Sequence, residues 1–302
     1  MIGLPPFRSW LYAPGNDPEI LERVFTAGAD AVILDLEDSV PPAEKERARS
    51  LVAEAVRRRA VAERPAVFVR VNGLATGQAD DDAWAVVVAG LTGIRVPKVE
   101  HPEEVRRFAA VISGAERAAG LAPGSVALVC GIESAAGVEA ASEIARADPR
   151  VATLSFGATD FIADIGGELG PAGLETLYAR SRLVVACRAA GLVPPVESVH
   201  IAIDDDEGLE RTTRASRALG LFGRACIHPR QLAIVHAVFT PTAAEIARAR
   251  EIVAAARSAA AAGRGALRLP DGSFVDPAVV RRADLVLRAA DAFPGAATEV
   301  ER

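Results

Sequence analysis

Two carboxylates in this sequence each follow an apolar run and could together hold a cation. The stretch VALVCGIESAAG, residues 126–137, ends a β-branched run with Glu133, and small residues come directly after it. Asp160 follows the next such run, in LSFGATD. Mg²⁺ binds one or two protein carboxylates and completes its octahedron with water and substrate. We therefore expect Glu133 and Asp160 to hold Mg²⁺, or Mn²⁺ in its place. Alternatively, Lys98 or Arg70 neutralises them in ion pairs.

Arg70, in VRVNGL, could recognise a small organic acid. A guanidinium binds a carboxylate through two parallel hydrogen bonds, which lysine cannot reproduce. Beside a metal ion, this geometry suits an α-keto or α-hydroxy acid. The alternative is an ion pair with Asp35 or Glu37, in the acidic cluster LDLED. We expect that cluster, which also contains Asp38, to orient Arg70, Lys98 and metal-bound water through hydrogen bonds rather than to react itself.

The sequence lacks the residue patterns that several other kinds of functional site require. The chain has four histidines and no HxxxH or CxxC spacing, which argues against zinc and non-haem iron. It contains no GxSxG, P-loop or GxGxxG motif, so serine hydrolases, P-loop enzymes and Rossmann cofactor sites lose support. His228, in CIHPRQ, is either a general base or a loop residue whose hydrogen bonds are satisfied, and both interpretations stay open.

The composition limits the partners and the compartment. The 302 residues are half hydrophobic and a quarter charged, with a net charge of −6 and no basic stripe, which argues against nucleic acid. No stretch approaches the ~20 apolar residues of a membrane span. Three widely separated cysteines in apolar contexts indicate buried free thiols and a reducing compartment. We expect a cytoplasmic protein with small-molecule substrates.

Short apolar runs alternate with amphipathic helical patterns over most of the chain. The eight predicted strands are residues 9–14, 31–37, 66–72, 93–99, 126–133, 152–158, 195–201 and 223–229. Such unalternated runs are typical of parallel strands buried on both faces. Eight βα units predict an α/β fold, a (β/α)8 TIM barrel, with an open doubly wound sheet as the alternative. In a barrel, the residues discussed above lie at the C-terminal ends of the strands, where barrel enzymes have their active sites.

The pattern changes in the last quarter of the chain. We expect a barrel domain over residues 1–238 and a C-terminal arm over residues 239–302. The arm combines a long Ala-rich helix, an extended stretch that turns at Pro-Asp-Gly, and a helix over about 277–292. It packs as an appendage, serves as a lid, or reaches a neighbouring subunit.

Nine motifs in order resemble a known enzyme family. They are LYAPGN, ILDLEDSVPPAEKERAR, VRVNGL, VPKVE, IESAAG, FGATDF, LYARSRLVVACRAAGL, GRACIHPRQ and VDPAVVRRADLVL. This series resembles the family of the citrate lyase beta subunit and of malyl-CoA and citramalyl-CoA lyases, within the HpcH/HpaI aldolase/citrate lyase superfamily. The likeness runs from about Arg8 to Leu287.

The resemblance implies a TIM barrel that binds Mg²⁺ and assembles as a homotrimer or hexamer. It also implies cleavage of a 3-hydroxyacyl thioester to an acetyl thioester and an α-keto acid. By resemblance, the metal ligands are Glu133 and Asp160, and the substrate is bound by Arg70, Thr159 and Asp160. The remaining implied site residues are Tyr12, Arg23, Ile227 and His228 on the CoA side, and Asp276 as the catalytic acid from an adjacent subunit.

Four functions therefore remain open. The first is cleavage of a malyl-, citramalyl- or citryl-CoA type substrate. The second is a citrate lyase beta subunit that acts on a citryl thioester of an acyl carrier protein. The third is a metal-dependent pyruvate aldolase that works without CoA. The fourth is a non-catalytic subunit that binds an oxyacid with Mg²⁺.

Overall fold

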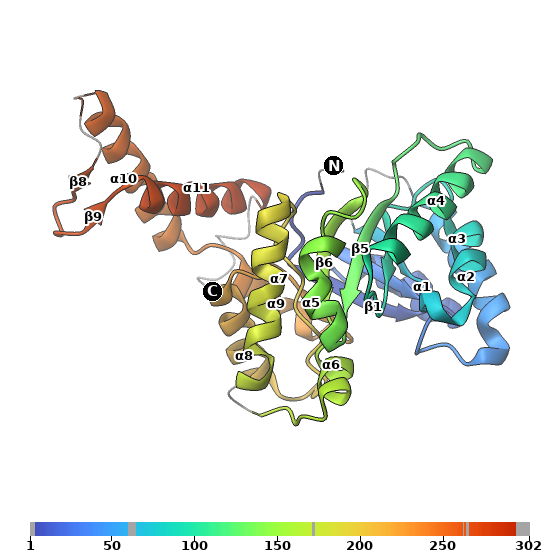
Figure 1. Ribbon diagram of the computed structural model, residues 1–302. Coiled ribbons are helices and arrows are strands. Elements are labelled where there is room, and N and C mark those ends of the chain that lie inside the picture. Colours follow the sequence, from blue (N-terminus) through green and yellow to red (C-terminus); the bar gives the residue numbers. More distant parts are fainter. Residues whose placement is uncertain (1–3, 60–64, 171–172, 262, 264–265, 294–302) are drawn as a thin grey trace. The chain divides into compact units, whose positions relative to one another are not determined.

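The computed structural model describes residues 4–59, 65–170, 173–261, 263 and 266–293. The chain divides into two compact units, Met1–His236 and Ala237–Arg302, and this boundary in the sequence is close to the expected one after residue 238 (Figure 1). Each unit has its own architecture.

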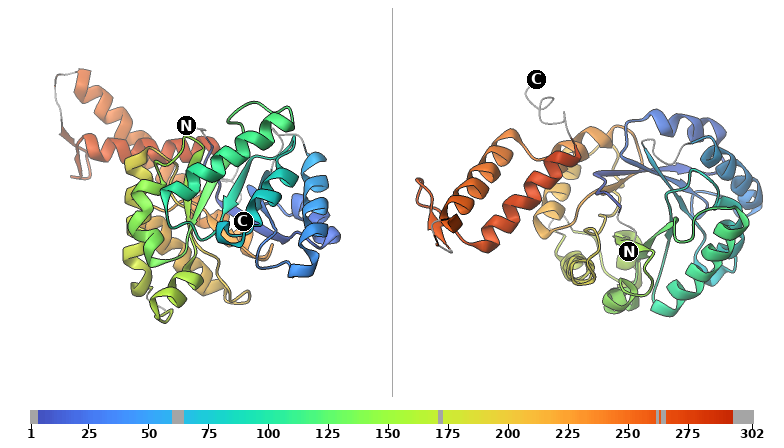
Figure 2. Two further views of the ribbon diagram at one scale, coloured as in Figure 1. Left: turned by 45° about the vertical axis from the view of Figure 1, so that its right-hand side comes forward. Right: turned by 90° about the horizontal axis from the view of Figure 1, so that it is seen from above.

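The first unit is built on a curled parallel sheet with helices around it (Figure 2). In the described part of the chain, the strands lie in the order β6-β5-β4-β3-β2-β1-β7. Neighbouring strands are parallel throughout, so their C-terminal ends share one edge of the sheet. The strands are β1 (Ser9–Pro14), β2 (Ala31–Asp35), β3 (Ala66–Arg70), β4 (Gly93–Val96), β5 (Ala127–Ile132), β6 (Val151–Phe156) and β7 (Arg224–Cys226).

The strand expected over residues 195–201 does not form. Only Val196 and Glu197 pair with the sheet, through one isolated parallel bridge each, to β6 and to β7. Two consecutive prolines at 194–195 precede them, and proline has no N–H group to donate to a strand ladder. The prediction of eight regular strands is therefore wrong at this position, and the observed sheet has seven.

The helices of the first unit begin and end near the signals in the sequence. Asp17 caps α1 by accepting hydrogen bonds from the N–H groups of Glu19 and Ile20, and Pro18 takes the first position. In the described ranges, no helix of either unit has the length and apolar composition needed to cross a membrane. The helical segments of this unit are α1 (Pro18–Arg23), η1 (Val24–Thr26), η2 (Pro42–Glu44), α2 (Lys45–Arg57), η3 (Leu74–Thr76), α3 (Ala79–Val86), α4 (Pro102–Ala118), α5 (Ala135–Ile144), α6 (Ala158–Ile165), η4 (Leu174–Thr176), α7 (Leu177–Ala190) and α8 (Asp206–Leu219), with α9 (Gln231–Phe239) at the end of the unit.

Aromatic and branched side chains fill the core of this unit. Trp10 packs against Phe7 and Phe68, with ring centroids 5.3 and 4.7 Å apart. Ile33, Val129 and other buried residues join the same cluster. The three cysteines are free and buried, as predicted. Burial raises the pKa of the Cys130 and Cys226 thiols to about 12.

Two buried ion pairs lie at the N-terminal edge of the sheet. Arg8, just before β1, donates from Nε and Nη2 to the two carboxylate oxygens of Asp30, each at 2.9 Å. Arg150, just before β6, donates from Nη1 and Nη2 to Glu116 at 2.7 and 2.6 Å. In both pairs, the guanidinium satisfies both oxygens of its partner.

The second unit is a helical hairpin. Helix α10 (Ala243–Ala261) leads to two short antiparallel strands, β8 (Leu267–Arg268) and β9 (Phe274–Val275), and helix α11 (Pro277–Ala292) follows. Small and branched residues bury the contact between the helices, namely Ala249, Val253 and Ala283. The long helix, the turn at Pro-Asp-Gly and the last helix lie where the sequence predicted them.

Candidate active site

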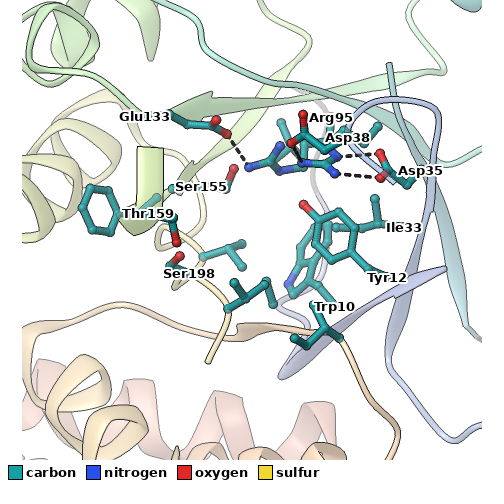
Figure 3. A pocket seen from close by; sticks show the side chains of 18 of the residues that line it. Trp10, Tyr12, Ile33, Asp35, Asp38, Arg95, Glu133, Ser155, Thr159 and Ser198 are labelled. Atoms are coloured by element: carbon teal, nitrogen blue, oxygen red, sulfur yellow. Dashed lines mark hydrogen bonds and ion pairs between the residues drawn. The ribbon is translucent and has the colours of Figure 1, made fainter. Parts of the chain in front are cut away.

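A cavity of about 440 Å³ lies at the C-terminal edge of the sheet, and we call it the central pocket. Figure 3 shows side chains from several strands pointing into it. Because parallel strands deliver their ends to one edge, the predicted site residues on neighbouring strands meet here. The polar residues that line the pocket are Tyr12, Asp35, Asp38, Ser39, Arg70, Arg95, Glu133, Ser155, Thr159, Asp160, Glu197 and Ser198.

Asp35, Arg70 and Arg95 stand beside one another on β2, β3 and β4. The register pairs Asp35 with Arg70, and Arg70 with Arg95. Residues paired across strands point to the same face of a sheet, so all three side chains enter the central pocket. The ring of Tyr12 lies close to both guanidinium groups, with its centroid 5.0 Å from Arg70 Cζ and 6.0 Å from Arg95 Cζ. Burial raises the pKa of the Tyr12 phenol, which keeps it neutral.

Arg70 is held by acidic side chains. Its Nε and Nη2 donate to the two oxygens of Asp35 at 2.6 and 2.7 Å. Its Nη1 lies 2.8 Å from Glu37 Oε2 and 3.3 Å from Asp38 Oδ2. Burial acts to raise the pKa of Asp35, but the hydrogen bonds and charge of Arg70 bring it below its ordinary value. The ion pair considered as an alternative is therefore present, and recognition of a substrate carboxylate by Arg70 stays a prediction.

Glu133 pairs with an arginine that the sequence analysis did not single out. Arg95 Nη2 donates to Glu133 Oε1 at 2.7 Å, and both residues are buried. The second terminal nitrogen, Arg95 Nη1, is buried and has no hydrogen-bond partner among the described residues. Burial acts to lower the pKa of Arg95, but the effects of Tyr12 and Glu133 outweigh it. The pKa therefore lies above its ordinary value, and the guanidinium stays charged.

Two glycines leave room for the Glu133 carboxylate. A Cβ atom on Gly157 would lie 2.6 Å from Glu133 Cγ and 2.8 Å from its Cδ. A Cβ atom on Gly131 would lie 2.7 Å from Glu133 Oε1 and 3.2 Å from Arg95 Nη2. Real Cβ atoms do not approach other atoms so closely, so only glycine permits this position of the carboxylate.

Asp160 and Thr159 lie in the first turn of α6, on the wall of the pocket next to Glu133. Asp160 is half-exposed, and its Oδ1 lies 3.4 Å from Lys98 Nζ. Lys98 Nζ also lies 3.6 Å from Glu37 Oε1. Lys98 is the one non-glycine residue with positive φ, at +52°, in the part of the chain that the structure describes. That conformation is costly for a residue with a Cβ atom, and such strain clusters at functional sites.

Glu37 has an unusual protonation equilibrium. Burial, helped by the charges of Asp38 and Glu133, raises its pKa to about 7, although Arg70 and Lys98 oppose the shift. Its carboxyl group therefore changes charge near neutral pH, beside the residues that line the central pocket.

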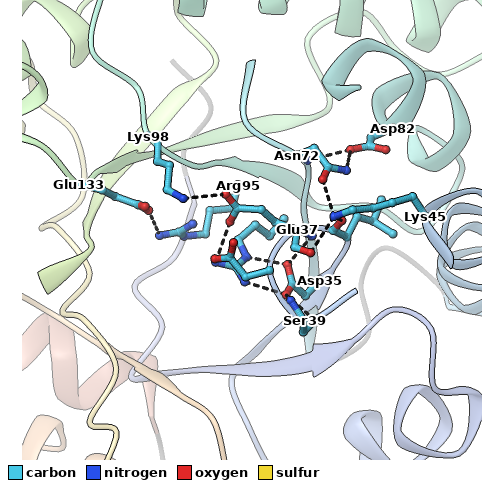
Figure 4. A network of polar contacts seen from close by, with 12 residues as sticks. Asp35, Glu37, Ser39, Lys45, Asn72, Asp82, Arg95, Lys98 and Glu133 are labelled. Carbon is cyan, nitrogen blue, oxygen red and sulfur yellow. Dashed lines mark hydrogen bonds and ion pairs between the residues drawn. The ribbon is translucent and has the colours of Figure 1, made fainter. Parts of the chain in front are cut away.

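A polar network braces this side of the site (Figure 4). Lys45 Nζ donates to the backbone oxygens of Leu36 and Glu37 at 2.7 and 2.8 Å, and to Asn72 Oδ1 at 2.6 Å. Asn72 Nδ2 in turn donates to Asp82 Oδ2 at 2.6 Å. Lys45 therefore fixes the backbone within the acidic cluster. The role of that cluster toward metal-bound water stays a prediction.

The residues present fit a magnesium ion. Glu133 and Asp160 supply two carboxylates to one pocket, and oxygen ligands of this kind suit Mg²⁺, which needs only one or two of them. Gly157 keeps the space around the Glu133 carboxylate open, and the Ser155 hydroxyl is buried without a hydrogen-bond partner among the described residues. No larger group of His, Cys, Asp or Glu side chains in the described ranges is arranged to hold a metal.

The residues expected on the CoA side lie in different surroundings. Tyr12 and Ile227 line the central pocket, but Arg23 and His228 do not belong to its lining. Arg23 is exposed on α1, and its Nε donates to the backbone oxygen of Glu19 at 3.3 Å. His228 Nδ1 accepts a hydrogen bond from the N–H group of Arg230 at 3.2 Å. A CoA role for these four residues stays a prediction.

Asp276 lies in the second unit and caps helix α11. Its Oδ1 accepts hydrogen bonds from the N–H groups of Ala278 and Val279 at 2.8 and 2.9 Å. Pro277 takes the first helical position, as is common after a capping residue. The structure thus gives Asp276 a local structural role, and its catalytic role in a neighbouring subunit stays a prediction.

Sequence reasoning missed Arg95 and Ser155. Arg95 lies inside GIRVPKV, the run that predicts the buried strand over residues 93–99. A charged residue inside a strand buried on both faces must have a partner or a function, and this signal could have identified it. Ser155 gave no comparable signal, because serine is common in strands and turns alike.

Comparisons with known proteins identify the family of this chain. Residues 8–229 match the family model of HpcH/HpaI aldolase/citrate lyase. A citrate lyase subunit beta-like protein of Deinococcus radiodurans is 40% identical over 288 residues, which cover 94% of this chain and 98% of the relative. An L-malyl-CoA/beta-methylmalyl-CoA lyase of Cereibacter sphaeroides is 36% identical over 307 residues, with 95% of each chain covered.

A solved structure matches almost the whole chain. It is CitE from Mycobacterium tuberculosis in complex with magnesium, acetoacetate and coenzyme A, with a TM-score of 0.76 and 31% identity. The match covers 95% of this chain and 98% of that one. The resemblance of the nine motifs is thereby confirmed, and the chain belongs to the HpcH/HpaI aldolase/citrate lyase family.

Proposed function

We propose that this protein is a Mg²⁺-dependent carbon–carbon lyase that cleaves a 3-hydroxyacyl thioester to an acetyl thioester and an α-keto acid. The observation that carries the proposal is the pair of carboxylates, Glu133 and Asp160, in one pocket with the guanidinium groups of Arg70 and Arg95. Oxygen ligands and carboxylate-binding cations are what an α-oxyacid bound with Mg²⁺ requires. Relatives named as lyases support the same reaction class.

Glu133 and Asp160 would hold the Mg²⁺ ion. When bound there, the ion supplies Lewis-acid polarisation of the carbon–oxygen bond that is a hydroxyl in the substrate and a ketone in the product. Asp35 keeps Arg70 in place, and Arg70 and Thr159 orient the α-keto acid through its carboxylate. This fixes the carbon–carbon bond that breaks.

Asp276 would deliver the proton that completes cleavage. As the ketone forms, the substrate hydroxyl gives its proton to water, and the electron pair of the broken carbon–carbon bond remains on the acetyl carbon of the thioester. A carboxylic acid can then protonate that carbon, or remove its proton in the reverse direction. We propose that this residue comes from the C-terminal arm of a neighbouring subunit, in a homotrimer or hexamer. Tyr12, Arg23, Ile227 and His228 would face the CoA part of the substrate.

A second candidate is a citrate lyase beta subunit that acts on a citryl thioester of an acyl carrier protein. The similarity to a citrate lyase subunit beta-like protein supports it. The chemistry at Glu133, Asp160 and Arg70 would be the same, and only the carrier of the thioester would differ.

A condensation panel tests the proposal. Acetyl-CoA is incubated with glyoxylate, pyruvate or oxaloacetate, with MgCl₂ or with EDTA, and the acyl-CoA products are identified by mass spectrometry. We expect a 3-hydroxyacyl-CoA product that requires the metal.

Product formed only with an acetylated carrier protein would favour the citrate lyase subunit. Condensation of pyruvate with an aldehyde without CoA would favour an aldolase. Binding of a keto acid without any product would point to a non-catalytic subunit.

Asp276→Asn tests the proton donor separately from the fold. Asparagine caps helices as well as aspartate does, so α11 should remain intact. We expect turnover to fall by about 10²–10⁴-fold, the usual contribution of a general acid or base. The matched control is Asp205→Asn, which changes the capping aspartate of α8 and should leave turnover unaffected. Wild-type turnover in Asp276→Asn would contradict the assignment.

A further inference from the structure

Two neighbouring arginines of the central pocket differ in how far their hydrogen bonds are satisfied. Arg70 uses Nε and Nη2 on Asp35, and its Nη1 lies between Glu37 and Asp38. Arg95 uses Nη2 on one oxygen of Glu133, and its Nη1 has no hydrogen-bond partner among the described residues, although the side chain is only 6% exposed. Of the two guanidinium groups, the one with a nitrogen that lacks any partner in the described ranges is therefore that of Arg95.

A second unpaired donor lies on another strand that lines the same pocket. Ser155 of β6 is 6% exposed, and its hydroxyl likewise lacks a partner in the described part of the chain. The register pairs Ser155 with Gly131, so both face the pocket, and Gly131 is the residue whose added Cβ would lie 3.2 Å from Arg95 Nη2. Figure 3 shows the Ser155 hydroxyl pointing toward the end of the Arg95 side chain.

The surroundings make these two donors selective. The deeper wall of the same pocket is apolar and contains Ile33, Val129 and Val196. In such surroundings a donor left unpaired is costly, and a charge-assisted hydrogen bond to an anion is strong. A site of this kind discriminates against ligands that leave its buried polar groups unpaired. A carboxylate fits both donors, because it accepts from a guanidinium and from a hydroxyl at once.

We propose that Arg95 Nη1 and Ser155 Oγ bind the second carboxylate of a dicarboxylic α-keto acid. The inference rests on the proposed function, in which Arg70 and the metal take the α-carboxylate and the keto oxygen. It assigns the keto acid to the four-carbon dicarboxylate class, as in a citryl-type thioester. Keto acids that end in hydrogen or a methyl group, such as glyoxylate or pyruvate, leave both donors unpaired.

A pair of stable ligands tests this specificity without turnover. Malate and 2-hydroxybutanoate share a four-carbon skeleton with an α-hydroxy acid, and differ in a carboxylate against a methyl group at the far end. Their dissociation constants are measured by calorimetry with MgCl₂ present. We expect the wild-type protein to bind malate at least about tenfold more tightly.

Two variants test which residues cause the preference for malate over 2-hydroxybutanoate. Arg95→Lys keeps a positive charge beside Glu133 but loses the planar second nitrogen, and Ser155→Ala removes only a hydroxyl. Each should lower the ratio of the two dissociation constants by about threefold or more. The matched controls are Arg150→Lys and Ser113→Ala, which change another buried Arg–Glu pair and the serine hydrogen-bonded to it, outside the pocket. Both controls should keep the wild-type ratio.

The outcomes separate this inference from the function on which it rests. If neither ligand binds in the presence of MgCl₂, the proposed lyase function itself is contradicted. If both bind with similar affinity to the wild-type protein, the second carboxylate site is wrong, and the lyase proposal stands. An unchanged ratio in Arg95→Lys or in Ser155→Ala removes that residue from the site.

Discussion

The two edges of the sheet use the same chemical groups in different ways. At the N-terminal edge, Arg150 reaches both carboxylate oxygens of Glu116, and backbone N–H groups satisfy the glutamate further. At the C-terminal edge, Arg95 reaches one oxygen of Glu133 and retains an unpaired nitrogen. Both pairs are buried, but only the second lines a cavity of about 440 Å³.

This difference separates stability from binding. A buried ion pair whose hydrogen bonds are all made within the protein has nothing left to offer a ligand. An ion pair that lies beside a cavity and has one unpaired donor can still bind a substrate or an ion. Here two glycines also leave the room that the carboxylate needs. Substitutions at four positions test how the two edges differ.

The largest effect is expected from Glu133→Gln. The side-chain oxygen can still accept from Arg95, but the negative charge for Mg²⁺ is lost. Turnover should fall by about 10³-fold or more, because metal stabilisation of the transition state amounts to several kcal/mol. Arg95 lines the cavity, where water can solvate its charge, so the free energy of unfolding should fall by less than the roughly 3–5 kcal/mol expected for a fully enclosed pair. Enzyme assays, Mg²⁺ calorimetry and urea denaturation measure the three quantities, and wild-type Mg²⁺ affinity would remove Glu133 from the metal site.

Glu116→Gln is the same substitution at the other edge, with the opposite expectation. It leaves Arg150 buried without its charge partner and turns an amide group toward backbone N–H donors. The free energy of unfolding should fall by about 3–5 kcal/mol, as for other broken buried ion pairs. Mg²⁺ affinity of the folded protein should stay at the wild-type level. A loss of Mg²⁺ affinity without a loss of stability would contradict the division between the two edges.

Glu37→Gln should change how stability depends on pH. The ordinary pKa of 4.5 rises to about 7 in the folded protein, so folding favours the protonated carboxyl. The stabilisation is complete below pH 4.5 and is lost as the pH rises through 7. The difference between wild type and Glu37→Gln should therefore change by up to about 3 kcal/mol over this range.

Urea denaturation in EDTA at several pH values measures that difference. Taking it between two proteins cancels the opposite contribution of His236, whose pKa burial lowers to about 4. A difference that is constant from pH 4.5 to 7.5 would show that Glu37 titrates normally.

The smallest effect is expected from relieving the strain at Lys98. Lys98→Gly and Lys98→Ala both remove the ammonium group, but only glycine adopts a φ of +52° without penalty. Lys98→Gly should be more stable than Lys98→Ala by about 1 kcal/mol, and both should be less active than wild type. Equal stability of the two variants in urea would mean that the backbone relaxes without cost.

Much of the fold could be predicted because its signals are local. Apolar runs identified the seven observed strands, and a proline turn with flanking helical patterns identified the hairpin of the second unit. The error over residues 195–201 has a local cause too: the predicted strand begins at Pro195, directly after Pro194, and neither proline can donate to a strand ladder. The comparisons confirmed the family from the same motifs.

The candidate site could be predicted only in part. Polar residues at strand ends were expected to gather, and Asp35, Arg70, Glu133 and Asp160 do line one pocket. The sequence could not show that Arg70 would give two of its donors to Asp35, or that Glu133 would pair with Arg95. These choices depend on distances between side chains from different strands.

The sequence by itself determined which residue types stand at the C-terminal ends of the strands, because each lies directly after its own apolar run. Only the tertiary structure decided which of their hydrogen-bonding atoms find partners within the protein. The register of β3 and β4 places Arg70 and Arg95 side by side, and Asp35 on β2 satisfies only the first of them. Hydrogen-bond capacity is used up by whichever partner lies within about 3 Å, and that proximity arises only when the strands pair.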